Sequence, residues 1–435
     1  MKWSGVSDRR VVDAVIRAFC DSAEQCCEGL SQIDERAWTS SYYWLDASGM
    51  ALYFLEQIET MSIESALPAA TLQRLRQNRD DNRRRSAAMF AEFAAINEQF
   101  QAAGVAYCNL KGFTLIPDSC PDAALRCQLD FDFLVDPDHL TACREILAGA
   151  GYMLVAAKKD VWEFTTGSSV PTKIEDHYKP RPQRSVELHF DPVVAAGHPS
   201  ARDERLDRSQ LRSWKGVTFP VLSSADQFAG QALHLLGHLR SPSTRTAWLL
   251  EFKRHVSVRK DDHDFWREVA ERSWSSPPAR LAIGIATALS FQIFGGQPPA
   301  ALQAWAVDHL PAPIRLWADS YGRQALLADF PGTKLHLLLE REMPRDDSPW
   351  QKKRFMFVPS LRATRIIFPK PEDKAWQRMR AELYQIRFIL FRMRFHLVHT
   401  LLYLREVPRW KRRLRMLRQP QLRRDSIIPS AEQSL

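Results

Sequence analysis

The sequence predicts an α+β protein in which a compact α/β core lies between mainly helical regions. Residues 1–103 carry apolar residues at spacings of three and four, which is typical of amphipathic helices. From residue 104 to residue 222 the pattern changes to short alternating strands separated by turns and helices. Helical patterns return over residues 223–372, and residues 373–435 form a basic amphipathic tail. We therefore expect four segments, with a small mixed sheet in the second.

The elements of the core follow from alternation and from turn residues. Residues 105–110 alternate like a strand, and Lys111–Gly112 predicts a turn into a short helix. Asp136 begins a second helix, which Gly149 ends. Residues 167–184 are rich in Gly, Ser, Pro, Lys and Arg, which indicates a loop. The remaining expected strands are 129–135, 152–156, 162–166, 185–190 and an edge-like segment at 219–222.

Helices should dominate on both sides of the core. Residues 74–100 contain neither glycine nor proline and predict one long helix, charged in its first half and apolar at its end. Gly104 then stops it. Beyond the core, helical patterns break at Pro277–Pro278, at 295–299 and at 369–371.

Composition limits the class of protein. The apolar fraction of 45% suits a globular fold, and no apolar run approaches the ~20 residues of a membrane span. We expect no signal peptide, because charged sequence follows the first residues directly. The seven cysteines are odd in number and form no Cys-x-x-Cys pair, so neither a zinc module nor a disulfide framework is indicated. Reduced thiols in a cytoplasmic protein are the simplest interpretation.

The positive charge belongs to the tail. The net charge is +9, but the stretch from Lys374 to Arg424 contains fifteen Lys and Arg against two acids, a surplus of 13. The rest of the chain is therefore at −4. The high isoelectric point says nothing about the charge of a site in the core.

Two carboxylates stand two residues apart inside an apolar strand. Alternate side chains of a strand share a face, so Asp130 and Asp132 should project together while Phe131 and Phe133 point into a core. Adjacent acids repel each other unless a cation lies between them. The pair therefore predicts a divalent-metal site and phosphate chemistry, although a solvated strand face would give the same pattern.

A third acid occurs on a later strand. Glu187 and His189 share one face of the strand 185–190, and the apolar residues share the other. Glu187 could hold a metal ion near a nucleophile, and His189 could support it or be structural. Upstream, Gly112 allows the close backbone approach that a phosphate-binding turn needs.

These motifs, in this order, resemble the uncharacterised bacterial nucleotidyltransferase family, which has a polymerase-β-type core. The resemblance is carried by the Leu-Lys-Gly turn at 110–112, Arg126, the acidic strand, the Gly151–Tyr152 pair and the Glu-Leu-His segment at 187–189. It extends over the leading helices and over residues 226–256. In the wider superfamily a Ser or Gly follows the turn, where Phe113 stands here, and Thr114 is the nearest hydroxyl.

The resemblance implies a polymerase-β-like nucleotidyltransferase core and a role for each matching residue. Asp130, Asp132 and Glu187 would be catalytic metal ligands for Mg²⁺ or Mn²⁺. Gly112 would line the phosphate turn, and Lys111 and Arg126 would contact phosphate. The implied reaction moves a nucleoside monophosphate from an NTP to an acceptor that the sequence does not identify.

Other interpretations stay open for several of these residues. Lys111 and Arg126 could be ordinary surface charges or ion-pair partners of the acids. His234 and His238 are four residues apart on a helix, a spacing that suits zinc, but no third ligand accompanies them. We favour helix packing for both histidines.

The role of the basic tail and the predicted activity also have alternative interpretations. The apolar run 386–404 with its arginines could be a core helix with a solvated end, a helix in an anionic membrane surface, or a docking face for RNA. The chain could accordingly be a catalytically inactive nucleotidyltransferase-like scaffold that binds a membrane or partner through its tail. A toxin-like enzyme acting on tRNA ends is a third alternative.

Overall fold

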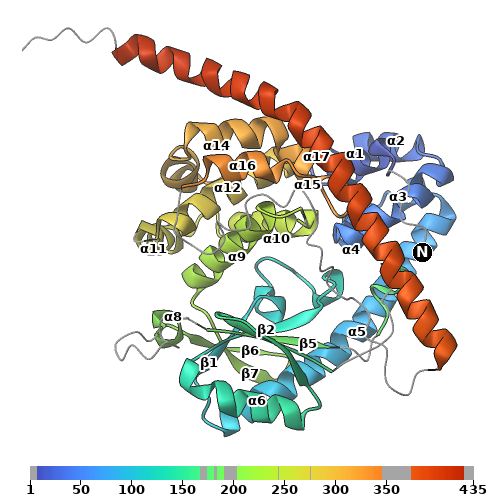
Figure 1. Ribbon diagram of the computed structural model, residues 1–435, viewed down its shortest axis with the longest axis vertical. Helices are drawn as coiled ribbons and strands as arrows, with labels where there is room; N and C mark the ends of the chain where they lie inside the picture. The colour runs from blue at the N-terminus through green and yellow to red at the C-terminus, as the bar shows by residue number, and fades with distance from the viewer. Residues whose placement is uncertain are drawn as a thin grey trace, which may run out of the picture.

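The computed structural model describes residues 7–166, 174–180, 184–190, 203–242, 244–274, 276–344 and 374–425, with side chains up to residue 417. Parts of the loop predicted at 167–184, and the proline break at 369–371, lie outside the described residues. A sheet with its covering helices forms one half of the molecule, and a bundle of helices forms the other (Figure 1). This arrangement confirms the predicted α+β class.

The sheet is mixed and has seven strands in the order β3-β4-β5-β2-β1-β7-β6. The β1/β7 and β2/β5 pairs are parallel, and the other four are antiparallel. The strands are β1 Tyr107–Leu110, β2 Asp130–Val135, β3 Met153–Ala157, β4 Val161–Thr165, β5 Ser185–His189, β6 Gln210–Trp214 and β7 Val217–Val221. The acidic strand β2 is thus the middle strand of the sheet.

Two details of the sheet differ from expectation. The segment at 219–222 was expected at an edge, but β7 lies between β1 and β6. The strand β6, which forms that edge, was not predicted. Its sequence Gln-Leu-Arg-Ser-Trp is mostly polar and largely exposed, so it lacks the alternation that marks a half-buried strand.

The long helix predicted at 74–100 is α5, Ala69–Ala102. Its apolar end covers one face of the sheet, where Phe93 contacts Phe113, Phe131 and Phe133. Its charged middle clamps the segment that leads into β2, because Asn82 donates to the carbonyls of Ala124 and Arg126. Arg85 donates to the carbonyl of Gln128 at 2.7 Å. The polar half of α5 therefore fixes the start of the acidic strand.

The other helices surround this core. The N-terminal helices are α1 Arg9–Arg17, α2 Ala23–Ser31, α3 Glu35–Ala47 and α4 Met50–Thr60, and α6 Leu140–Gly149 follows β2. The short α8 is Glu204–Asp207. The bundle contains α9 Ser224–Leu239, α10 Thr246–Val258, α11 His263–Trp274, α12 Pro277–Phe294, α13 Ala300–Leu302, α14 Ala312–Trp317, α15 Arg323–Leu326 and α16 His336–Glu342. The bundle lies across the sheet face opposite α5.

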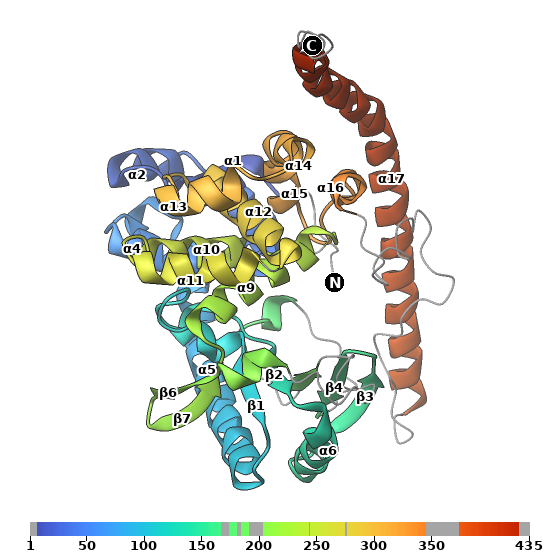
Figure 2. The same ribbon diagram turned by 90° about the vertical axis from the view of Figure 1, so that its left-hand side faces the viewer.

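The described part of the basic tail, residues 374–425, contains one helix, α17 Ala375–Asp425, which stands along one side of the molecule (Figure 2). Among the described residues, no helix is both long and apolar enough to cross a membrane. All seven cysteines are free thiols.

Candidate active site

The three predicted acids lie on two neighbouring parallel strands. In the register of β2 and β5, Asp132 is the direct partner of Glu187, and Asp130 is the partner of Ser185. Asp130 and Asp132 share the face of β2 that looks toward the bundle, because Phe131 and Phe133 pack on α5. Two strands that are more than fifty residues apart in the chain thus bring the carboxylates together.

His189 completes the cluster. Its Nε2 lies 3.1 Å from Oδ1 of Asp132 and 3.3 Å from Oε2 of Glu187. One potential ligand atom each of Asp132, Glu187 and His189 lies within 4.8 Å of the other two. Two carboxylates and one imidazole are a set of groups that could hold a divalent metal ion. Asp130 lies on the same face, outside this group of three.

Lys111 provides the nearest cation. Its Nζ donates to Oδ1 of Asp132 at 2.8 Å. Burial opposes ionisation of Asp132, but Lys111 and His189 outweigh burial and hold its pKa below the usual range. Burial likewise opposes the charge on His189, and the bonds to Asp132 and Glu187 raise the pKa of the imidazole. Lysine and imidazole together stabilise the most deeply buried carboxylate of the cluster.

Asp130 is in the opposite situation. Burial, and then the neighbouring carboxylate of Asp132, raise its pKa from 3.8 to about 6. Within the described part of the chain, Gln128 donates to the main-chain oxygen of Asp130 and no group donates to its side-chain oxygens. A carboxylate that is costly to ionise beside another acid is a position where a bound cation has a large stabilising effect.

The turn before the acidic strand is strained. Lys111 has φ 51° and ψ −157°, a region that side chains rarely adopt, and Gly112 follows with φ 53°. A Cβ on Gly112 would lie 2.4 Å from Nε2 of Gln128, so a larger residue could not occupy this turn without displacing its neighbour. The bond of Lys111 to Asp132 and the bond from Thr114 Oγ1 to the Lys111 carbonyl, 2.8 Å, hold the turn in place.

Phe113 is a core residue. Its ring lies between those of Phe90, Phe93 and Trp214, with centroid distances of 5.2–5.6 Å. The hydroxyl of Thr114 is buried and bonded to the backbone of the turn. The residue after the turn glycine therefore packs between α5 and the edge strand β6 and does not face the acids.

Arg126 has a buried partner. Its Nε lies 3.2 and 3.3 Å from the two carboxylate oxygens of Glu251 in α10. The hydroxyl of Tyr53 in α4 donates to the same carboxylate at 2.8 Å. Burial opposes the charge on Arg126, but Glu251 outweighs it and raises the pKa of the guanidinium. The partner of Arg126 is thus Glu251 and not one of the strand acids, and a phosphate contact by Arg126 stays a prediction.

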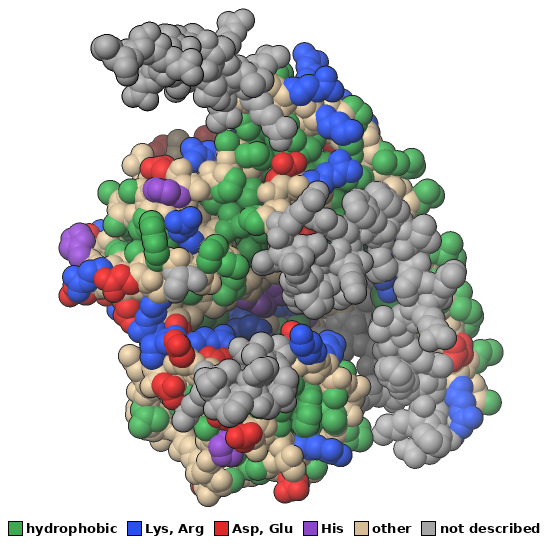
Figure 3. All heavy atoms as spheres, turned by 60° about the vertical axis from the view of Figure 1, so that its left-hand side comes forward, with side chains coloured by type: hydrophobic (Ala, Val, Ile, Leu, Met, Phe, Trp, Pro, Cys, Tyr) green, Lys and Arg blue, Asp and Glu red, His purple; other side chains and the backbone are tan. Residues whose placement is uncertain are grey.

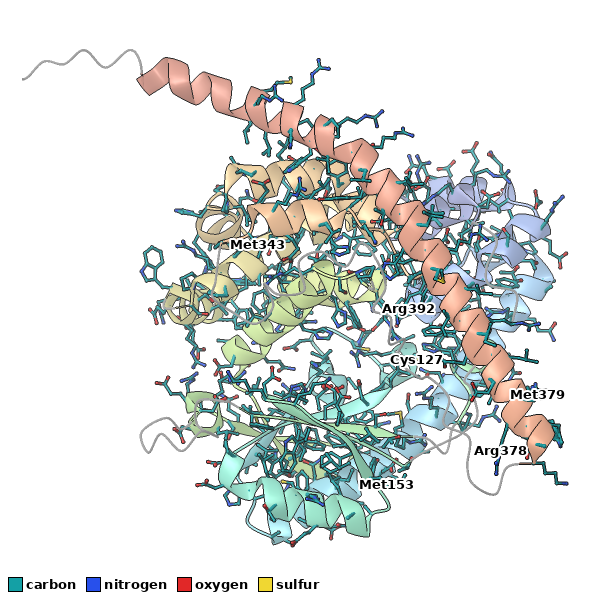
Figure 4. The ribbon with its side chains drawn as sticks, viewed as in Figure 1. Cys127, Met153, Met343, Arg378, Met379 and Arg392 are labelled. Atoms are coloured by element: carbon teal, nitrogen blue, oxygen red, sulfur yellow. The ribbon has the colours of Figure 1, made fainter. Side chains whose placement is uncertain are left out.

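A cleft of 510 Å³ separates the acids from the bundle. Lys111, Arg126 and the three acids line it on the sheet side. Figure 3 shows a hollow between the two halves that contains histidine and basic side chains, and Cys127, labelled in Figure 4, lies at this level. The bundle side is lined by His234, His238, Arg245 and Trp248.

The two histidines of α9 pack against Trp248, with centroid distances of 4.9 and 4.3 Å. Burial, then the charges of Lys111 and His238, hold the pKa of His234 well below its usual value. Within the described residues, neither histidine belongs to a group of three potential metal ligands. The packing interpretation is therefore supported, and sequence reasoning missed that both histidines also line the cleft that contains the acids.

Carboxylates on adjacent strands of a mixed sheet, behind a glycine turn and facing a cleft, define the class of nucleotidyl-transferring folds that the sequence predicted. The family model of an uncharacterised nucleotidyltransferase matches residues 34–295, so the chain belongs to this family. No curated protein matches the chain significantly. The match covers the N-terminal helices from α3 onward, the sheet and the bundle through α12.

The substitution Asp130→Asn should stabilise the metal-free protein at neutral pH. The folded-state pKa of about 6 lies above the ordinary 3.8, so ionisation favours unfolding and the wild type loses stability as the pH rises from 4 through 6. The amide has no such cost, and we expect a gain of about 1–3 kcal/mol above pH 6 that shrinks below it. Thermal unfolding in a chelator at several pH values measures the difference. An unchanged difference across this range would contradict the assigned environment of Asp130.

The substitution Arg126→Met should destabilise the fold by about 3–5 kcal/mol, because it leaves the Glu251 carboxylate buried without its cation. Replacing Glu251 by Met as well should recover most of this loss. Denaturant unfolding of the two variants measures both effects. If Arg126→Met unfolds like the wild type, the buried pair is not the main role of this arginine.

Proposed function

We propose that this chain transfers a nucleoside monophosphate from an NTP to an acceptor hydroxyl. One observation carries the proposal: ligand atoms of Asp132, Glu187 and His189 converge within 4.8 Å, with Asp130 beside them on the floor of a cleft. In the reaction, the acceptor oxygen forms a bond to the α-phosphorus as the bond to pyrophosphate breaks. The acceptor proton leaves as the nucleophile attacks, and Glu187 assists its removal.

The acids would hold the metal ions. Asp130 and Asp132 would bind them from β2, and Glu187 would bind the ion nearest the acceptor. Bound Mg²⁺ or Mn²⁺ would activate the acceptor oxygen and neutralise charge on the pyrophosphate. The surplus of carboxylates over nearby cations, with Asp130 costly to ionise, supports this role.

The floor of the cleft has the residues to bind the triphosphate. Lys111 is within bonding distance of Asp132 and could exchange this partner for a phosphate oxygen, since both are anions. Gly112 is buried beside Gln128 and does not itself line the cleft, so its role in this proposal is to let the strained turn present Lys111. Arg126 contacts Glu251 through Nε and also lines the cleft, so its terminal nitrogens, which donate to no group within the described ranges, would be able to bind phosphate.

The bundle side of the cleft would contact the base or the acceptor. Trp248 and His238 form an aromatic wall opposite the acids, with Arg245 over the indole at 5.5 Å. Planar rings beside a cation suit a nucleobase or another flat polar group. Because this wall comes from the bundle, substrate choice and metal binding would reside in different halves of the molecule.

Asp132→Asn and Glu187→Gln should each lower the rate of nucleotide transfer by at least about 100-fold. Loss of a residue that only contacts a metal ligand usually lowers activity by less than this. The full chain is incubated with each α-labelled NTP, Mg²⁺ or Mn²⁺ and a cell extract, and both labelled products and released pyrophosphate are followed. Asp138→Asn, at an exposed position of the short 3-10 helix Pro137–His139 after β2, is the matched control and should retain activity.

Turnover that survives both site substitutions would contradict the proposal. Saturable NTP binding without any label transfer or pyrophosphate release would instead identify the inactive scaffold. Label found on tRNA ends would define the acceptor and leave the assigned roles of the acids intact.

A further inference from the structure

The helix α17 carries an exposed apolar stripe that the proposed function does not use. Its members recur at spacings of three and four, and each is 52–65% exposed. The apolar stripe comprises Trp376, Met379, Leu383, Ile386, Leu390, Met393, Leu397, Leu401 and Leu404. At the helical rise of 1.5 Å it is about 42 Å long. Surface residues of this size and regularity usually mark an interaction site.

The helix packs on the molecule through its opposite face. Phe395, Tyr403 and Trp410 are buried, and α17 lies against α14 and α16. The indole Nε1 of Trp410 donates to Glu342 at 3.1 Å, and Lys334 donates to Thr400 at 2.7 Å. These contacts hold the apolar stripe outward, where Figure 3 shows apolar side chains along the edge formed by α17.

Basic residues lie beside the apolar stripe and beyond its end. Arg380, Arg387 and Arg394 are exposed and recur every seventh residue, so they form a line along one flank. Beyond Leu404 the exposed side chains are mainly basic, namely Arg405, Arg409, Lys411, Arg412, Arg413 and Arg415. Residues 374–417 contain twelve Lys and Arg against two Glu. Arg378 and Met379 mark the start of the helix in Figure 4, and Arg392 lies farther along it.

We infer that α17 docks the enzyme on an anionic lipid surface, with the apolar stripe in the headgroup–acyl boundary and the arginines at the phosphates. An amphipathic helix lies in such an interface when a long apolar face is combined with Lys and Arg. The negative charge of acidic lipids complements the positive charge of the arginines on this flank. None of the described helices can span a bilayer, so the helix lies in the plane of the surface.

Two other occupants fit the observations less well. The spacing of the stripe would suit a coiled coil with a second copy, but the flank opposite the arginines offers one acid, Glu382. Two copies would therefore leave most of these arginines without a matching anion. RNA would match the charge, but it would not need nine exposed apolar side chains in a row.

Vesicle flotation of the full chain, without nucleotide, tests the inference. The wild type should float with phosphatidylcholine vesicles that contain phosphatidylglycerol, and not with phosphatidylcholine alone. The triple variant Leu383→Glu, Leu390→Glu, Leu397→Glu should bind at least about tenfold less, and so should Arg387→Gln with Arg394→Gln. The double variant Val155→Glu, Leu211→Glu removes exposed apolar residues elsewhere and should float like the wild type.

Three outcomes would overturn the inference. Binding that the triple variant retains would indicate a patch for polyanions such as RNA. Light scattering that shows a wild-type dimer and a monomeric triple variant, without vesicle binding, would assign the stripe to a second copy. Equal binding to neutral and anionic vesicles would remove the role of the arginines. An unchanged circular dichroism spectrum shows that the triple variant is folded, and no outcome depends on nucleotide transfer.

Discussion

Mutual repulsion among carboxylates is the constraint on which the rest of the structure depends. Asp130, Asp132 and Glu187 lie on two adjacent strands at the floor of a cleft, where water screens their charges poorly. Lys111 and His189 contact Asp132 but leave Asp130 with a raised pKa. Asp130 therefore costs stability when it is ionised and no further positive charge is bound. This cost to the metal-free protein is what the proposed cation binding would offset, a trade of stability for function that is common at functional sites.

The surrounding fold keeps these acids in register. The middle of α5 fixes the segment before β2 through Asn82 and Arg85, and its end packs the aromatic core under the same strand. On the other side, Arg126, Glu251 and Tyr53 join the sheet, the bundle and the N-terminal helices in one buried network. The cleft lies between these two layers. The buried network therefore ties the side of the cleft that carries the acids to the side that carries the aromatic wall.

Much of the site could be predicted from the sequence, because period-two alternation places Asp130 with Asp132 and Glu187 with His189 without any knowledge of the fold. Their meeting could not be predicted from the pattern alone, since β2 and β5 pair across more than fifty residues. The ion pair between Arg126 and Glu251 could not be predicted either, because nothing in the sequence distinguishes Glu251 from a surface acid of an amphipathic helix. The strand β6 could not be predicted because it is polar and exposed. The role of Phe113 as a core residue depends on aromatic neighbours such as Trp214, which the sequence pattern does not reveal.

The location of a bound divalent cation is the most direct test of the account. Crystals of the full chain soaked with Mn²⁺ and a non-hydrolysable NTP, measured for anomalous scattering, would show it. We expect an anomalous peak bonded to carboxylate oxygens of Asp132 and Glu187, with the triphosphate beside Lys111 and Gly112. A peak elsewhere, or bound nucleotide with Lys111 still on Asp132 and no cation between the acids, would contradict the account.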